Sequence, residues 1–109
     1  MSKPGVFEIT KYYVLLALAK EAAHGYALSD QLIADTVGGI YLRPSTLYTT
    51  LQALEKAGLI ERVGANGVAA GAGRKTYRLT ALGQRRLADQ ARMHERGARL
   101  AKERLGLRY

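Results

Sequence analysis

The chain has 109 residues and a formal net charge of +8, with 48% hydrophobic and 24% charged residues and no cysteine. This length suits one compact domain, the composition excludes a disordered chain, and the lack of cysteine excludes a disulfide scaffold and thiol chemistry. Acids and bases balance over residues 1–43, with four of each, whereas residues 44–109 carry thirteen bases and five acids. We therefore expect a polyanionic partner, nucleic acid first and an acidic membrane surface second.

Nothing in the sequence predicts a membrane or secreted protein. No apolar run approaches the roughly 20 residues that a membrane-spanning helix needs, and the N-terminal MSKPGVFEITK lacks the apolar centre of a secretory signal. We expect a cytoplasmic location.

Two helices are predicted before residue 40. The segment ITKYYVLLALA, residues 9–19, is apolar almost all round, which indicates a helix buried on more than one side, with Thr10 as its N-cap. After the interruption HGY at 24–26, the segment ALSDQLIADTVGG, residues 27–39, places leucines at helical spacing before two glycines. We expect a second, shorter helix that ends at Gly38-Gly39.

A third helix is predicted after residues 40–43, which suit either a brief strand or an extended lead-in. Pro44 fits the first helical position, where its missing N–H costs nothing, and Ala57-Gly58 ends the helix. One face of this helix is a stripe of leucines. The opposite face carries Ser45, Thr49, Gln52 and Lys56.

A β-hairpin should follow, formed by LIERV at 59–63 and RKTYRLT at 74–80. The alternation in the second segment turns Tyr77 inward, and the connecting GANGVAAGAG at 64–73 is uncharged.

Thr80 is expected to cap a long last helix whose small and apolar residues recur with a period near 3.5. Such a seam needs a partner helix, and we predict that a second copy of the chain supplies it. An amphipathic membrane-surface helix is the alternative, but this seam is narrow and rich in alanine. The predicted dimerisation residues are Leu87, Ala91, His94, Ala98, Ala101 and Leu105.

These elements, in the order α-α-β-α-β-β-α, predict a mainly α (α+β) fold, a winged helix-turn-helix with a long C-terminal dimerisation helix. Residues 1–80 would form the DNA-binding domain and residues 81–109 the dimerisation helix. In that architecture the third helix enters the major groove, where short polar side chains reach base edges, and Lys56 meets a phosphate or a guanine.

Three separated segments resemble the PadR family of bacterial transcriptional regulators: LLALAKEAAHGYALSDQL, LRPSTLYTTLQALEKAGLIE and GRKTYRLTALGQRRL. They run in order over about residues 12 to 87, and the single long tail helix resembles the short subgroup of the family. The resemblance implies a homodimer that binds a pseudo-palindromic double-stranded operator on the nucleoid. It also implies a repressor that a small aromatic or drug-like ligand releases.

The candidate DNA contacts combine the outward face of the third helix with positions that the resemblance implies. Arg43 stands where many family members have a small polar helix cap, so it is available for a phosphate. The full set is Tyr26, Arg43, Ser45, Thr46, Tyr48, Thr49, Gln52, Lys56, Arg74 and Lys75.

A candidate effector site follows from the expected dimer. First helices packed beside tail helices would leave an apolar space whose aromatic rings stack on a planar ligand. The residues concerned are Tyr12, Tyr13, Leu16 and Met93.

Enzyme activity is not expected, because the sequence offers no nucleophile paired with a histidine, no usefully spaced carboxylates and no phosphate-binding loop. His24 and His94 are the only histidines and have no acidic cluster beside them, so we expect neither a metal nor a cofactor. The alternative function is a winged-helix protein–protein interaction module, whose DNA binding would be weak and insensitive to salt.

Overall fold

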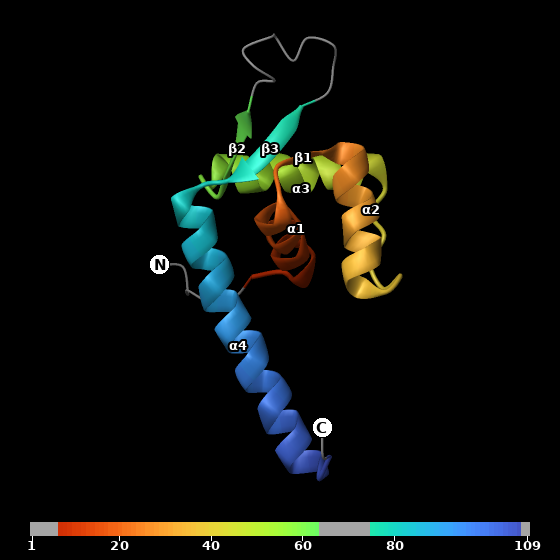
Figure 1. Ribbon diagram of the computed structural model, residues 1–109, viewed down its shortest axis with the longest axis vertical. Helices are drawn as coiled ribbons and strands as arrows, with labels where there is room; N and C mark the ends of the chain where they lie inside the picture. The colour runs from red at the N-terminus through yellow and green to blue at the C-terminus, as the bar shows by residue number, and fades with distance from the viewer. Residues whose placement is uncertain (1–6, 64–74, 108–109) are drawn as a thin grey trace.

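The computed structural model describes residues 7–63 and 75–107 of the chain. The fold is mainly helical with one small sheet, which agrees with the predicted class (Figure 1). Its elements in chain order are α1 (Ile9–Lys20), β1 (Ala23–His24), α2 (Gly25–Thr36), α3 (Pro44–Lys56), β2 (Ile60–Val63), β3 (Thr76–Leu79) and α4 (Ala81–Leu105).

The first strand precedes α2, so the predicted order of elements is wrong at one place. β1 pairs antiparallel with β3, which is the central strand of the sheet β1-β3-β2. Residues 40–43 form the extended lead-in rather than a strand, because none of the strands in the described part of the chain pairs with them. Instead, the amide of Ile40 donates to the Thr36 hydroxyl at 2.9 Å, at the end of α2.

The predicted N-cap of α1 is also wrong. The helix begins one residue before Thr10, and its N-cap is Glu8, whose carbonyl accepts the amide of Tyr12 at 3.0 Å. The Glu8 side chain makes no capping hydrogen bond. An apolar helix that is held by its tertiary contacts does not depend on a cap for its position.

The core forms where α1, α2 and α3 meet the sheet. Leucines from each helix are almost fully buried, and Tyr77 of β3, 3% exposed, packs among them as predicted. In α3 the buried positions are the predicted stripe, Leu47, Leu51 and Leu54. Because that stripe faces inward, the helix turns its other side to solvent.

A close backbone approach sets the direction of α4. The Thr80 amide donates to the Leu59 carbonyl at 3.1 Å, and the Thr80 hydroxyl donates to the Gly58 carbonyl and accepts from the Gly83 amide at 3.0 Å. Thr80 is therefore the N-cap, as predicted. Gly83 is required here, since a Cβ at this residue would lie 2.0 Å from the Leu59 oxygen.

α4 extends well beyond the rest of the fold (Figure 1). Its first half contacts α1, and its last turns are exposed, including Ala98, Ala101 and Leu105. Within the described residues, no helix combines the length and the apolar character that crossing a bilayer requires.

Candidate nucleic-acid interface

The outward face of α3 is polar and open. Ser45, Thr49, Gln52 and Lys56 lie on this face, four, three and four residues apart, and all four are exposed. None of them is acidic, so nothing on this row repels a phosphate. The row is long enough to span several consecutive base pairs, because it covers three turns of the helix.

Two threonine hydroxyls of α3 already have an internal partner. Thr49 donates to the Ser45 carbonyl at 3.0 Å, and Thr50 donates to the Thr46 carbonyl at 2.9 Å. A hydroxyl that donates its proton to the helix keeps its lone pairs, so Thr49 presents an acceptor and a methyl group to an approaching molecule. Adenine and cytosine offer amino donors in the major groove, and thymine offers a methyl group.

One ion pair joins α3 to the wing, the hairpin of β2 and β3, and a second ion pair joins the two strands of the wing. Arg62 of β2 donates to the Glu55 carboxylate of α3 at 2.9 Å, and Arg78 of β3 donates to Glu61 of β2 at 2.8 Å. The hydrogen bond to Glu55, together with its negative charge, raises the pKa of Arg62. Both acids neutralise arginines of the wing, so the unpaired positive charges nearest α3 are carried by other residues.

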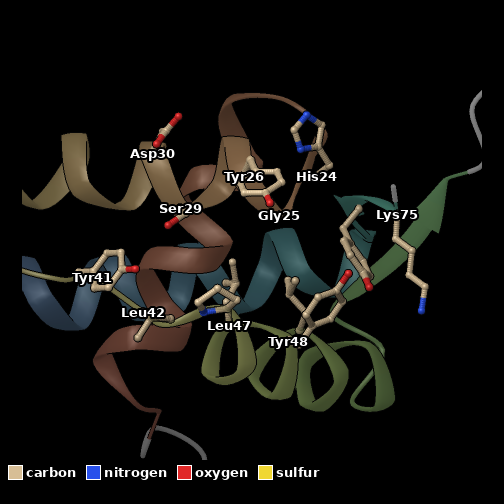
Figure 2. Close-up of a pocket in the computed structure, with 13 residues that line it drawn as sticks. His24, Gly25, Tyr26, Ser29, Asp30, Tyr41, Leu42, Leu47, Tyr48 and Lys75 are labelled. Atoms are coloured by element: carbon tan, nitrogen blue, oxygen red, sulfur yellow. The ribbon is translucent and has the colours of Figure 1, made fainter. Parts of the chain in front are cut away.

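Three predicted DNA contacts from separate elements lie around one pocket (Figure 2). Tyr26 lies at the start of α2, Tyr48 on α3, and Lys75 just before β3. Their side chains are exposed, with Tyr26 at 77% and Tyr48 at 46%. The fold therefore joins the turn, the third helix and the base of the wing into one surface.

Other predicted contacts border this surface. Arg43 is the N-cap of α3, is exposed, and makes no side-chain capping bond, as its departure from a small polar cap implied. Thr46 is exposed in the first turn of α3. Arg74, together with the loop at 64–73, lies outside the described residues.

Sequence reasoning missed Tyr41. This tyrosine follows α2, is 64% exposed, and lines the same pocket as Tyr26 and Tyr48. Tyr41 is an isolated aromatic residue in a segment without hydrophobic periodicity, so nothing in the sequence indicates its place in this pocket.

The candidate effector residues are only partly brought together. Tyr12 and Leu16 line a groove between α1, β3 and α4, where Leu87 and Ala91 form the other wall. The Tyr12 and Tyr13 rings lie edge to face with their centroids 5.3 Å apart. Neither Tyr13 nor Met93, which is 48% exposed, is among the residues that line the groove. Burial, followed by the neighbouring Tyr13, raises the pKa of Tyr12.

The predicted dimerisation seam divides into two parts. Leu87, Ala91 and His94 are partly buried, and the His94 ring lies 4.3 Å from the Tyr12 ring of the same chain. The remaining three residues, Ala98, Ala101 and Leu105, are exposed. Among the described residues, no group of three His, Asp or Glu side chains is arranged to hold a metal ion.

Comparison with protein families gives one match over most of the chain. The sequence model of the Transcriptional regulator PadR-like family matches residues 14–89. An uncharacterized protein of Lysinibacillus sphaericus is 32% identical over 76 residues, which cover 70% of this chain and 69% of that protein. The matched range contains α2, α3, both wing strands and the start of α4.

Solved structures with this fold include two that illustrate the arrangement. A PadR-like transcriptional regulator from Bacillus cereus aligns with a TM-score of 0.72 at 21% identity, covering 89% of this chain and 91% of that one. Bacillus subtilis PadR in complex with operator DNA aligns with a TM-score of 0.60 at 24% identity, covering 75% of this chain and 46% of that one. The likeness establishes the winged-helix fold with its long C-terminal helix.

Proposed function

The chain belongs to the PadR-like family of transcriptional regulators, whose members are not enzymes, and from that premise we propose that it is a dimeric, sequence-specific DNA-binding repressor. In this proposal α3 enters the major groove of a pseudo-palindromic operator, and one α3 from each protomer reads one half-site. The protein would act in the cytoplasm, on the nucleoid.

One observation carries the proposal: the polar row of α3 continues into an exposed surface formed by Tyr26, Tyr48 and Lys75. A polar helix face that contacts only water does not require exposed side chains from neighbouring elements beside it. Operator DNA, in contrast, contacts the groove and the flanking phosphates together. The Bacillus subtilis relative with the same fold was solved bound to operator DNA.

The side chains divide by what they can reach. Ser45, Thr49 and Gln52 are short or medium polar groups in the middle of the row, and we assign them to base edges. Arg43, Lys56 and Lys75 carry positive charge at the borders, and we assign them to phosphates. The remaining predicted contacts keep supporting roles: Tyr26, Thr46, Tyr48 and Arg74.

Dimerisation is proposed through the exposed end of α4. Ala98, Ala101 and Leu105 are exposed in the part of the chain that the structure describes, and the two alanines are small enough to permit a close helix–helix approach. Residues 1–80 would then serve as the DNA-binding unit and residues 81–109 as the connection between protomers. The first half of α4 contacts α1, so a movement of the dimer would reach the DNA-binding unit through that contact.

Relief of repression by a small aromatic ligand completes the proposal. The groove beside Tyr12 and Leu16 has a volume of about 580 Å³ and mostly apolar walls. Such a groove is large enough for a drug-sized molecule. A ligand there would touch both α1 and α4, the two helices that connect the DNA-binding unit to the dimer contact.

The deciding experiment measures binding to the DNA upstream of the protein's own gene and to a random duplex, each at low and moderate salt. We expect tight, sequence-selective binding that weakens steeply as salt rises, since lysine and arginine contacts release counterions from DNA. Thr49→Ala should weaken binding to the specific site much more than binding to the random duplex.

A matched control is Thr50→Ala, because Thr50 also donates to the helix backbone but is partly buried. This variant should bind the operator as the wild type does. Weak binding without sequence preference or salt dependence would favour the protein–protein interaction module instead.

A further inference from the structure

α4 carries more positive charge than its contacts within the chain use. The helix contains seven bases and three acids, which amounts to half of the net charge of +8. Arg92 is paired with Asp89. Among the described residues, Arg85, Arg96 and Arg99 take part in no ion pair. Their charges are therefore available to a partner from outside the chain.

Four exposed arginines form one row along the outward face of α4. At 3.6 residues per turn they lie within about 60° of one another around the helix axis, and the row is about 21 Å long. The buried Gln90 and the His94 ring, which lies against Tyr12 of α1, are on the opposite side of the helix, as is the seam proposed for the dimer. The row is therefore open to solvent in the single chain and stays open in the proposed dimer. The members of this arginine row are Arg85, Arg92, Arg96 and Arg99.

The direction of α4 separates the arginine row from α3. Figure 1 shows α4 running away from α3 and from the hairpin of β2 and β3. Arg96 and Arg99 lie more than about 20 Å along the helix from its first residue. A duplex on the outward face of α3 would therefore lie at the other end of the molecule from these two arginines. The row is not a continuation of the proposed operator surface, and its charge suits a second polyanion.

Duplex DNA fits the arginine row better than an anionic membrane does. Each DNA strand carries one phosphate per about 3.4 Å of helix axis, so a row of about 21 Å meets several phosphates, and a guanidinium binds a phosphate through two parallel hydrogen bonds. A helix that lies on a membrane needs a wide apolar face beside its charges. The first half of α4 instead packs against α1, and the exposed seam beyond it consists mostly of alanine.

The acids on α4 limit how strongly the row attracts DNA. Asp89 neutralises Arg92, and Glu95 and Glu103 flank the remaining arginines. Binding should therefore be moderate and sensitive to salt. Phosphate contacts also carry no information about base sequence, so the row should not distinguish one duplex from another.

From these observations we propose that the arginine row is a second DNA-binding surface, which holds a duplex through its phosphates without reading its sequence. A dimer bound to its operator through α3 then holds another DNA segment along α4 and bridges the two. Bridging rests on the proposed function, whereas DNA binding by the row does not.

The first test isolates the row from α3 in the full-length protein. Every variant carries Thr49→Glu, which places a negative charge on the outward face of α3 and weakens phosphate binding there. Fluorescence anisotropy over a salt series measures binding to a labelled random-sequence duplex. Adding Arg96→Gln and Arg99→Gln should weaken this binding at least about tenfold at low salt. The slope of log K against log salt should become shallower by about 0.9 for each phosphate contact that is lost.

The matched control adds Arg86→Gln and Arg104→Gln to the Thr49→Glu protein instead. These two exposed arginines remove the same charge from the same helix, but they lie about 100° around the axis from the row. The control should bind the random duplex as the Thr49→Glu protein does. Equal losses in both pairs, or no duplex binding by the Thr49→Glu protein, would overturn the proposal.

A bead assay tests bridging and separates the two proposals. Beads carry the DNA upstream of the protein's own gene, and a labelled random duplex is free in solution. The wild type should retain the labelled duplex on the beads, whereas Arg96→Gln with Arg99→Gln should bind the beads and retain little of it. If the row binds the random duplex but the wild type shows no preference for the upstream DNA, the row stands and the repressor function fails. If the wild type binds the upstream DNA selectively but retains no second duplex, the row proposal fails alone.

A membrane surface is the other polyanion to test. Vesicles of phosphatidylglycerol and phosphatidylcholine in equal parts are sedimented with the wild type and with the variant that carries Arg96→Gln and Arg99→Gln. Loss of vesicle binding in this variant, together with unchanged binding to the random duplex, would assign the row to lipid and overturn the proposal.

Discussion

A lysine at the edge of the proposed interface offers a test that distinguishes a phosphate contact from recognition of the base sequence. Lys75 lies just before β3, is exposed, and has no ion-pair partner among the described residues. If it binds a phosphate, Lys75→Gln should weaken binding to every duplex by a similar factor. The slope of log K against log salt should become shallower by about 0.9 for each phosphate that the protein no longer neutralises.

Fluorescence anisotropy over a salt series measures this slope. Arg104→Gln serves as the control, because it removes one positive charge near the end of α4, far from the hairpin (Figure 1). A Lys75→Gln slope equal to that of the wild type would remove the phosphate contact from the proposal.

Tyr77 gives a pH-dependent prediction. Burial, followed by the negative charge of Glu55, raises the pKa of Tyr77 above its ordinary value near 10. Because the folded state disfavours the phenolate, this contribution to stability is fully present below about pH 10 and is lost as pH rises through the raised pKa.

Tyr77→Phe should remove that loss. The free energy of unfolding of the variant relative to wild type should stay constant from about pH 7 to 9 and then shift in favour of the variant above about pH 10. Urea unfolding at a series of pH values measures the difference. Parallel curves for the two proteins over the whole range would contradict the assignment.

At the scale of elements, the junction between α3, β2 and α4 depends on one glycine. Gly83→Ala would place a Cβ 2.0 Å from the Leu59 carbonyl oxygen, which is held by the Thr80 amide. Backbone cannot move aside cheaply, so we expect a loss of about 2 to 3 kcal/mol in the free energy of unfolding.

Gly97→Ala is the matched control on the same helix. Nothing lies within 4 Å of a Cβ at Gly97, so replacing this glycine should stabilise the helix by about 0.5 to 1 kcal/mol. Thermal unfolding should therefore show opposite shifts for the two variants. Equal shifts would mean that the Leu59 contact is not what requires Gly83.

The starts of α3 and α4 could be read from the sequence because local signals mark them. Pro44 begins α3 and Thr80 caps α4, as predicted, since both residue types act through their own backbone or hydroxyl. β1 has two residues and no periodicity, so only its pairing with β3 defines it. Pairing is a tertiary contact that sequence periodicity cannot predict.

The part of the candidate site that lies within one helix was predictable from the sequence, whereas the part formed by separate elements was not. The exposure of Ser45, Thr49 and Gln52 follows from the position of the buried leucines within one helix. The meeting of Tyr26, Tyr41 and Tyr48 depends on how α2 and α3 are placed by the core, which involves residues far apart in sequence.

At the scale of the whole molecule, the ion pairs determine which positive charges are available to bind DNA. The sequence places its excess of bases after residue 43, but Arg62 and Arg78 on the wing strands are paired with Glu55 and Glu61. Because they are paired, these arginines are less available to DNA. Among the described residues, the positive charge that DNA would meet near α3 therefore comes from Arg43, Lys56 and Lys75.

The proposed dimer makes its strongest prediction at Ala101, on the exposed half of the α4 seam. In the single chain this residue is exposed, so Ala101→Glu should not alter folding. In a dimer the same change would bring two like charges into a close helix contact without a partner, which we expect to raise the dimer Kd at least about tenfold. Sedimentation equilibrium measures the association, and circular dichroism checks that helix content is retained.

Arg96→Ala is the control, because it also lowers the net charge by one but lies on the opposite face of α4 from Ala101 and Leu105 and is exposed. It should leave the dimer intact. Operator affinity should depend on dimerisation, because a protomer without its partner contacts one half-site instead of two. Ala101→Glu should therefore weaken operator binding at protein concentrations below its new dimer Kd and approach wild-type binding above that concentration. If the variant instead remains dimeric at all concentrations, the dimer contact lies elsewhere on the chain.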